Sequence, residues 1–520
     1  MTLFISVITF LVIFSILVLI HEAGHFWAAR KAGIKVEEFG FGLPPRLWGK
    51  KTTRKVEYKD KNGKKKKDKE TMIWSLNWIP FGGFVRMLGE DDDSKEAKSD
   101  PRSFGNRPIG WRIIVVCAGV IMNFLLAWFL LVVIFSIGVD PVGFPSASDK
   151  EYGDTFERGV VKAPKDFDLF AFAPMTMTKE GIQKNIDNGV VEVLDGPGVQ
   201  IAGFTSEESP AKQAELKYGD IITAVDGKEV RNTQELIAAL DINKEIEGIQ
   251  ISSVAENSIA SEKDLKPGDI ITFVDQTPIK SVEDLKNKLK EEAKGAGFHV
   301  SVDRRKEDGT NETRTKVLMP DEKGEIGVSF LEKGFYFDLL LKRDGELKKD
   351  MKFVLLDENN KLGVGIFPCP PILKINKIQL PFYQAPIAAT TESVKLSVLT
   401  VKMLGQVVTT VLQKFAVPEG VAGPVGIAQM THELVEIGEI VRILMFMALI
   451  SISLAVVNIM PFPALDGGRL IFLLFEFITG KKPNAKWEAT IHAIGLIVLL
   501  GLIFLVTWSD IVRIVSNLKN

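Results

Sequence analysis

The sequence predicts a multi-pass α-helical membrane protein with four transmembrane helices, a large extracytoplasmic α+β part and a membrane-associated β-loop in the cytoplasm. Three observations favour this fold class. Four segments are apolar over the thickness of a bilayer core, 46% of the 520 residues are hydrophobic, and 25% are charged. A bundle of membrane helices alone would carry fewer charges, so the charged residues predict substantial parts in water.

Each of the four apolar segments is long enough to cross a bilayer as a helix. They run from Leu3 to Ile20, from Ile113 to Val139, from Ile443 to Met460 and from Ala489 to Trp508. The first resembles a secretory signal peptide in length, but its basic residues Arg30 and Lys31 follow the apolar run instead of preceding it. We therefore expect an uncleaved anchor whose N-terminus lies outside the cytoplasm.

Basic residues predict the orientation of the spans. The loop between the first two spans is rich in lysine, including the run from Lys64 to Lys67, and the loop before the fourth span contains Lys481, Lys482 and Lys486. The positive-inside rule places both loops in the cytoplasm, so residues 140 to about 440 and both termini are expected outside. The lysine run is a solvated hairpin tip or, as an alternative, a patch that faces phospholipid.

The first apolar run ends in the sequence His21-Glu22-Ala23-Gly24-His25. Histidines four residues apart share one face of a helix, so both imidazoles can reach one zinc ion, and Glu22 is close enough to polarise a zinc-bound water. If the spacing had arisen by chance, Glu22 would be a costly acid at a membrane boundary without a partner or a task. The segment therefore predicts a zinc site for hydrolysis in or near lipid.

A second motif lies at the end of the third span, which reads Asn458-Ile459-Met460-Pro461-Phe462-Pro463-Ala464-Leu465-Asp466-Gly467-Gly468. The prolines break the helix, and irregular backbone at membrane depth is tolerated only where it lines a protein cavity. A role as third metal ligand would explain Asp466, although an Asp-Gly turn at a helix end is the alternative. Spans one and three are expected to run in the same direction, which puts Asp466 at the same membrane face as the histidines.

The extracytoplasmic part contains an internal repeat. Leu216-Lys217-Tyr218-Gly219-Asp220-Ile221-Ile222 recurs as Leu265-Lys266-Pro267-Gly268-Asp269-Ile270-Ile271, and each copy continues into a tight turn and a helix. The pattern resembles tandem PDZ domains, which bind extended peptide ends by strand addition. A steric filter against bulky external domains is the alternative role. The first copy is short, so its remaining strands must come from upstream, near residues 189 to 194, or be missing.

These assignments divide the chain into eight consecutive parts. They are a first transmembrane helix (1–35), the cytoplasmic β-loop (36–110), a second transmembrane helix (111–139), the first PDZ domain (140–246), the second PDZ domain (247–332), a following region with a helix on the outer membrane surface (333–440), a third transmembrane helix (441–480) and a fourth (481–520).

Together the motifs resemble the site-2 protease family of intramembrane metalloproteases, in the bacterial type that cleaves anti-sigma factors. The resemblance runs through nearly the whole chain. Its carriers are His21-Glu22-x-Gly24-His25-Phe26, Ile79-Pro80-Phe81-Gly82-Gly83-Phe84-Val85, Gly119 to Asn123, and Asn458 through Leu465-Asp466-Gly467-Gly468. Many relatives have Gly-Pro before the asparagine of the second span, where this chain has Gly119-Val120.

The resemblance implies a role for each of these residues. Zinc would be bound by His21, His25 and Asp466, Glu22 would be the general base, and Asn458 would bind substrate backbone or steady the oxyanion. It also implies substrate contacts at Asn123, Gly82 and Gly83, the glycines belonging to a membrane-associated β-sheet beside the active site. A substrate helix must unwind before its peptide bonds can be reached, so an edge that holds an extended strand is needed.

The expected partners are single-pass membrane proteins such as anti-sigma factors or signal-peptide remnants, already trimmed outside by another protease. Membrane lipid and peptide ligands of the PDZ domains are further expected partners, and no nucleic acid is expected. The implied location is the bacterial cytoplasmic (inner) membrane. Two alternatives stay open: a catalytically idle PDZ-bearing receptor for envelope peptides, and a membrane zincin that faces water and uses a glutamate as third ligand.

Overall fold

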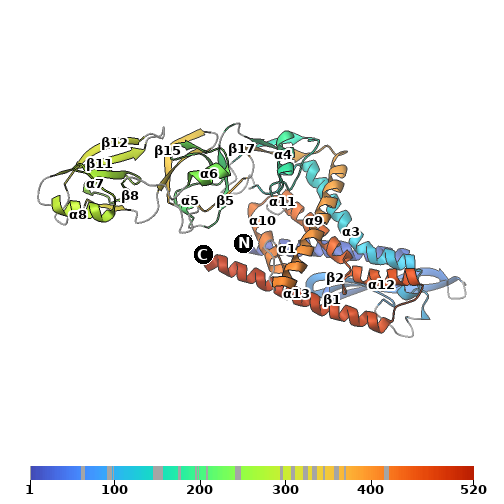
Figure 1. The fold of residues 1–520 in the computed structure, drawn as a ribbon. Helices are drawn as coiled ribbons and strands as arrows, with labels where there is room; N and C mark the ends of the chain where they lie inside the picture. Colours follow the sequence, from blue (N-terminus) through green and yellow to red (C-terminus); the bar gives the residue numbers. More distant parts are fainter. Residues whose placement is uncertain are drawn as a thin grey trace. The chain divides into compact units, whose positions relative to one another are not determined.

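The computed structural model comprises two compact units, one formed by Met1–Val139 with Ile378–Asn520 and the other by Asp140–Lys377 (Figure 1). The structure describes residues 2–59, 65–90, 97, 99–144, 156–173, 177–193, 196, 198–206, 209–240, 248–292, 297–305, 311–319, 326–330, 336–343, 346–355, 362–367, 370–414 and 421–519. Lys64, at the start of the lysine run, lies outside the described residues.

The first unit is a helical bundle joined to a β-hairpin. Its helices are α1 (Thr2–Lys31), α3 (Ile109–Ile137), α9 (Ala385–Lys414), α10 (Pro424–Ile437), α11 (Ile440–Ile459), α12 (Asp466–Thr479) and α13 (Ala485–Lys519), with a 3₁₀ turn at Phe104–Asn106. The central helix is α3, which packs against α1, α9, α11 and α12. It is apolar all round, as expected of a helix enclosed by protein and lipid.

Five of these helices, judged by length and composition among the described residues, could cross a membrane: α1, α3, α9, α11 and α13. The sequence predicted four spans and placed the stretch from Pro381 to Leu412 on the membrane surface. That stretch is α9, which runs back along α3, since the indole Nε1 of Trp128 donates to the hydroxyl of Thr390 at 3.0 Å. The predicted placement of this helix on the outer membrane surface stays a prediction.

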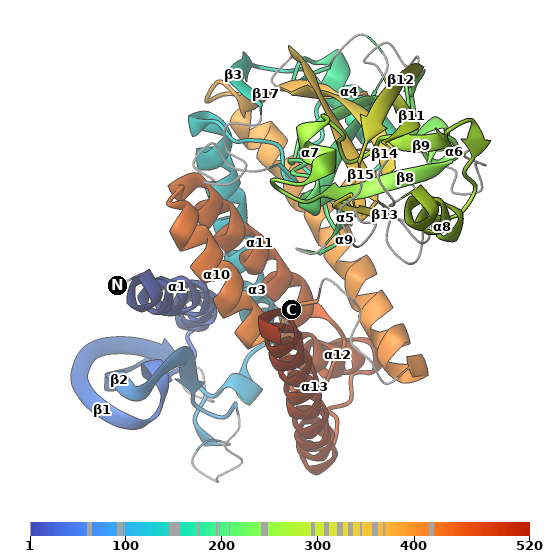
Figure 2. The same cartoon turned by 90° about the vertical axis from the view of Figure 1, so that its left-hand side faces the viewer.

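The hairpin consists of β1 (Val36–Lys59) and β2 (Lys65–Met87), which pair antiparallel. Each strand bends, so the hairpin contains four short paired segments. Residues 83–86 pair with 38–41, residues 38–41 pair on their other side with 73–76, and residues 73–76 pair in turn with 48–51. The result is a curled sheet with 83–86 as an edge strand (Figure 2). Because β2 also packs against α1, this edge is carried next to the helix that contains the two histidines.

Two similar sheets form most of the second unit. One has the order β12-β11-β9-β8-β13, with β10 paired to β9, and the other has the order β15-β14-β6-β5-β16, with β7 paired to β6. The elements of the first are β8 (Ile249–Val254), α7 (Ile259–Glu262), β9 (Ile270–Val274), β10 (Thr277–Pro278), α8 (Val282–Glu292), β11 (Phe298–Arg305), β12 (Asn311–Leu318) and β13 (Val328–Phe330). Those of the second are β5 (Val199–Phe204), α5 (Pro210–Gln213), β6 (Ile221–Val225), β7 (Lys228–Glu229), α6 (Thr233–Ala239), β14 (Tyr336–Arg343), β15 (Glu346–Leu355) and β16 (Val364–Ile366).

The two copies of the repeat are built alike. Gln200 and Gln250 are both buried and donate to the carbonyls of Gly219 and Gly268, at 3.1 and 3.2 Å. Matching positions also supply the two cores, with the pairs Ile201 and Ile251, Leu216 and Leu265, Ile222 and Ile271, and Leu236 and Leu285 all buried. The internal repeat read from the sequence is therefore a structural repeat.

The domain boundaries predicted for the first copy are wrong. Its sheet is completed by β14, where Leu339 pairs with Val225, and by β16, where Ile366 pairs with Ile201. The second copy is thus inserted into the first, which takes strands from both sides of it instead of ending at residue 246. The upstream segment β4 (Val191–Val193) belongs elsewhere, to a sheet of order β3-β17-β4 with β3 (Glu157–Lys162) and β17 (Ile372–Gln379); α4 (Lys179–Asp187) precedes it.

Candidate metal centre

The two histidines of the HExxH motif lie in the last third of α1, and Asp466 is the first residue of α12. The three side chains meet in the helical unit. Nε2 of His21 is 3.1 Å from Nε2 of His25, and Oδ2 of Asp466 is 3.2 and 3.4 Å from these two nitrogens. Both histidines are buried, so three potential metal ligands face one another in a small protected space.

These distances fit a zinc ion. Ligands at about 2.0–2.1 Å from zinc in a tetrahedral arrangement lie about 3.3 Å from one another. The observed edges of 3.1, 3.2 and 3.4 Å form a nearly regular triangle of that size. Two imidazoles and one carboxylate also leave a fourth position for water or substrate, which is the ligand set of a catalytic site rather than a structural one.

The protonation of His25 is set by its other ring nitrogen. Nδ1 lies 2.8 Å from the carbonyl oxygen of Val115 on α3, and because a carbonyl only accepts, Nδ1 carries the proton. The lone pair of Nε2 then faces Asp466 and His21. An outer hydrogen bond of this kind fixes the orientation of a metal-binding imidazole and makes it more basic.

A glycine of α3 makes room for both imidazoles. A Cβ atom at Gly119 would be 2.7 Å from Nε2 of His21 and would overlap Nε2 of His25. Gly24 of α1 lies against the backbone of Ala118 in the same way, so no Cβ fits there either. The helices α1 and α3 therefore touch through glycines at the level of the site. The Nε2 atoms of both histidines, which would bind the metal, lie directly on the surface of α3.

The turn before Asp466 is held by α13. Ala464 adopts a left-handed conformation with φ of 76°, and its N–H donates to Nδ1 of His492 at 2.8 Å. Pro463 packs so closely on Gly495 of α13 that a Cβ there would overlap it. The sequence analysis did not single out His492, although an ionisable residue within an apolar span is itself a signal of a functional position.

The remaining predicted residues lie around this centre at different distances. Asn123 is buried on α3 with its amide nitrogen 3.4 Å from Nδ1 of His21. A Cβ at Gly83 would touch Cγ of Glu22 at 3.4 Å, so the edge strand 83–86 lies against the predicted base, and Gly82 precedes it with φ of 80°. Asn458 is half-buried near the end of α11. The substrate-binding roles of these residues stay predictions.

Comparison with known proteins agrees with this geometry. The model of Peptidase family M50 matches residues 9–61 and 63–502 of the chain. The chain belongs to peptidase family M50. It is therefore a zinc metalloprotease of the site-2 protease family, and the resemblance inferred from the sequence is confirmed.

Related M50 proteins align over almost their whole length. The chain is 26% identical to the Regulator of sigma E protease of Haemophilus influenzae, with 97% of this chain and 98% of the relative covered. It is also 26% identical to the Regulator of sigma-E protease RseP of Escherichia coli, again with 97% and 98% covered. The chain and these relatives therefore match over almost their whole lengths.

Proposed function

We propose that the protein hydrolyses peptide bonds within transmembrane segments of single-pass membrane proteins, as a step of regulated intramembrane proteolysis. The observation that carries the proposal is the position of the metal centre on a membrane-type helix. His21, Glu22 and His25 lie on α1, Asp466 of α12 meets them, and the first half of α1 is apolar and exposed. Leu3 and Phe4 of α1 are 67% and 70% exposed, which suits contact with lipid. The same helix, α1, also carries His21, Glu22 and His25, so these groups lie next to its lipid-facing part.

Each residue has a chemical task in this proposal. His21, His25 and Asp466 would hold zinc, which would supply a water molecule of lowered pKa and a positive charge that polarises the scissile carbonyl. Glu22 would take a proton from the attacking water and pass it to the leaving amine, a general acid–base role that contributes about 10²- to 10⁴-fold to the rate. The amide of Asn458 donates to the oxyanion of the substrate.

The edge strand 83–86 supports a route for the substrate. It pairs with residues 38–41 on one side, and Gly83 lies against Glu22. An unwound substrate segment adding to this edge would have its backbone hydrogen bonds satisfied while one carbonyl faces the zinc site. Gly82 and Gly83 leave space for such an approach, and Asn123 completes the predicted substrate contacts.

Relatives named as regulators of sigma E support a proposal for the cellular setting. We infer a location in the bacterial inner membrane, with both termini and the repeat domains outside the cytoplasm. The substrate is a single-pass protein already shortened on its outer side by another protease. The two repeat copies resemble PDZ domains and either bind the new peptide end or exclude untrimmed proteins by size.

The experiment is cleavage of a tagged single-pass substrate without a folded external domain, using the purified protein and Glu22→Gln in detergent. We expect a product that maps inside the transmembrane segment, formed by wild type only, while both proteins bind one zinc. A substrate that keeps a folded external domain should be cut more slowly. If wild type with zinc bound leaves every such substrate intact, the proposal fails and the idle-receptor alternative gains support.

A further inference from the structure

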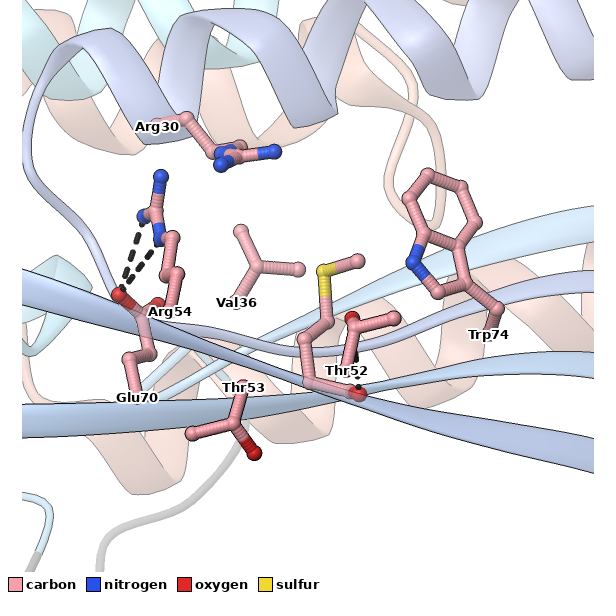
Figure 3. Close-up of a pocket in the computed structure, with 8 residues that line it drawn as sticks. Arg30, Val36, Thr52, Thr53, Arg54, Glu70 and Trp74 are labelled. Atoms are coloured by element: carbon pink, nitrogen blue, oxygen red, sulfur yellow. Dashed lines mark hydrogen bonds and ion pairs between the residues drawn. The ribbon is translucent and has the colours of Figure 1, made fainter.

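A second site lies in the helical unit, away from the metal centre. It is a cavity of about 240 Å³ between the last turn of α1 and the β1–β2 hairpin (Figure 3). Arg30 reaches into it from α1, Arg54 reaches toward it from β1, and the ring of Trp74 closes the opposite side. The floor is apolar, with Val36 only 1% and Met72 only 9% exposed.

The charges in the cavity do not cancel. Glu70 is buried and accepts from Nε and Nη2 of Arg54 at 3.2 and 3.0 Å, so this pair is neutral. The guanidinium of Arg30 stacks over the ring of Phe26 at 5.1 Å, and among the described residues no carboxylate lies within ion-pair distance of it. The cavity therefore carries one net positive charge on a planar donor group, which suits a singly charged oxyanion.

The position of the cavity relative to the membrane indicates which kind of oxyanion it meets. A helix of 30 residues such as α1 is about 45 Å long, which equals a bilayer with its headgroups, and Arg30 is its penultimate residue. Trp27 and Trp48 nearby are 59% and 57% exposed, as is typical of tryptophan at a membrane interface. Arg30 thus lies at the level of phospholipid phosphates, which are monoanions when they are diesters.

We propose that this cavity binds the phosphate group of a membrane phospholipid. Arg30 donates to the phosphate from above, the free N–H groups of Arg54 donate from the side, and the glycerol carbons lie on Val36 and Met72. Because the cavity is formed jointly by α1 and the hairpin, the bound lipid ties the sheet that carries the edge strand 83–86 to the helix that carries the zinc ligands. The proposal requires that α1 crosses the membrane and is independent of the proposed proteolysis.

The test is binding of a short-chain phosphatidylglycerol to the purified full-length protein in a neutral detergent, measured by thermophoresis. Wild type, Arg30→Gln and Lys31→Gln are compared, since Lys31 is exposed in the same turn and does not line the cavity. We expect saturable binding to wild type, at least about tenfold weaker binding to Arg30→Gln, and no change for Lys31→Gln. All three proteins should bind zinc equally, which shows that they are folded.

A second arm separates lipid from free anion. Inorganic phosphate at millimolar concentration is added as a competitor to wild type. We expect it to leave the binding of phosphatidylglycerol unchanged, because the apolar floor and Trp74 contribute only to the lipid. Equal binding to wild type and Arg30→Gln, an equal loss in both variants, or full displacement by inorganic phosphate would each overturn the proposal.

Discussion

The substitution Gly119→Ala tests the geometry of the metal centre most directly. The added Cβ would be 2.7 Å from Nε2 and from Cε1 of His21, whereas carbon atoms in ordinary contact lie about 3.5 Å or more apart. The imidazole would have to withdraw by about 0.8 Å, and a zinc–ligand distance tolerates a change of only about 0.2 Å. At least one histidine is then lost as a ligand.

The expected effect is large enough to measure without an activity assay. Changes that only disturb the outer hydrogen bonds of metal ligands already weaken metal binding about 10- to 100-fold. For Gly119→Ala we expect at least a 100-fold loss in zinc affinity, or about 3 kcal/mol. Competition with a chelator, followed by measurement of the zinc retained, gives this value.

A matched control is available on the same helix. Gly110 is also in α3, and nothing lies within 4 Å of the position that its Cβ would take, so Gly110→Ala should keep the wild-type zinc affinity. Alanine is the better helix former, so neither variant is expected to disturb α3 itself. Wild-type zinc affinity in Gly119→Ala would refute the inference that the imidazoles lie against this glycine.

Three further predictions concern other parts of the chain. His492→Ala removes the acceptor for the N–H of Ala464, so we expect the zinc affinity to fall about tenfold. His492→Asn restores an acceptor and should recover part of this affinity. Equal zinc affinity in wild type and both variants would contradict a positioning role for His492. Removing zinc with a chelator should abolish cleavage of the model substrate, and adding zinc back should restore it; cleavage that persists in metal-free protein would exclude the proposed chemistry. In the second repeat copy, the hydrogen bond from Arg304 holds the pKa of Asp264 below its usual value, so this pair stabilises the fold above about pH 4 and the stabilisation is lost as the pH falls through the lower folded pKa. Arg304→Gln should therefore lower the melting temperature at pH 7 and lower it less at pH 3. An equal difference at both pH values would show that the pair with Asp264 does not contribute and that Arg304 acts through its other contacts, such as its hydrogen bonds to Asp269.

The sequence was sufficient for the chemistry of the site because its motifs are local. The spacing of His21 and His25 places both on one helix face. The prolines Pro461 and Pro463 predict a break in the helix, and irregular backbone at membrane depth is expected only where it lines a protein cavity. The long apolar runs likewise predicted α1, α3, α11 and α13. These inferences depend on neighbouring residues along the chain, so a single sequence carries them.

What the sequence did not reveal depends on contacts between distant segments. The strands β14 and β16 have no motif that assigns them to the first repeat copy, and only their pairing with β6 and β5 does so. The hydrogen bond from Ala464 to His492 is of the same kind, since it joins the turn before α12 to α13 and no sequence pattern links these two residues. The prediction of a helix on the outer membrane surface could not show that α9 lies along α3.

The insertion of one repeat copy into the other also imposes an order on biogenesis. The second copy occupies one continuous stretch, so it can fold as soon as its own residues have left the ribosome. The first copy cannot close its sheet until residue 366 has followed, although its first strand begins at Val199. Its half-finished edge at β6 must stay unpaired throughout the synthesis of the inserted copy, which leaves this strand open to pairing with a wrong partner during that time.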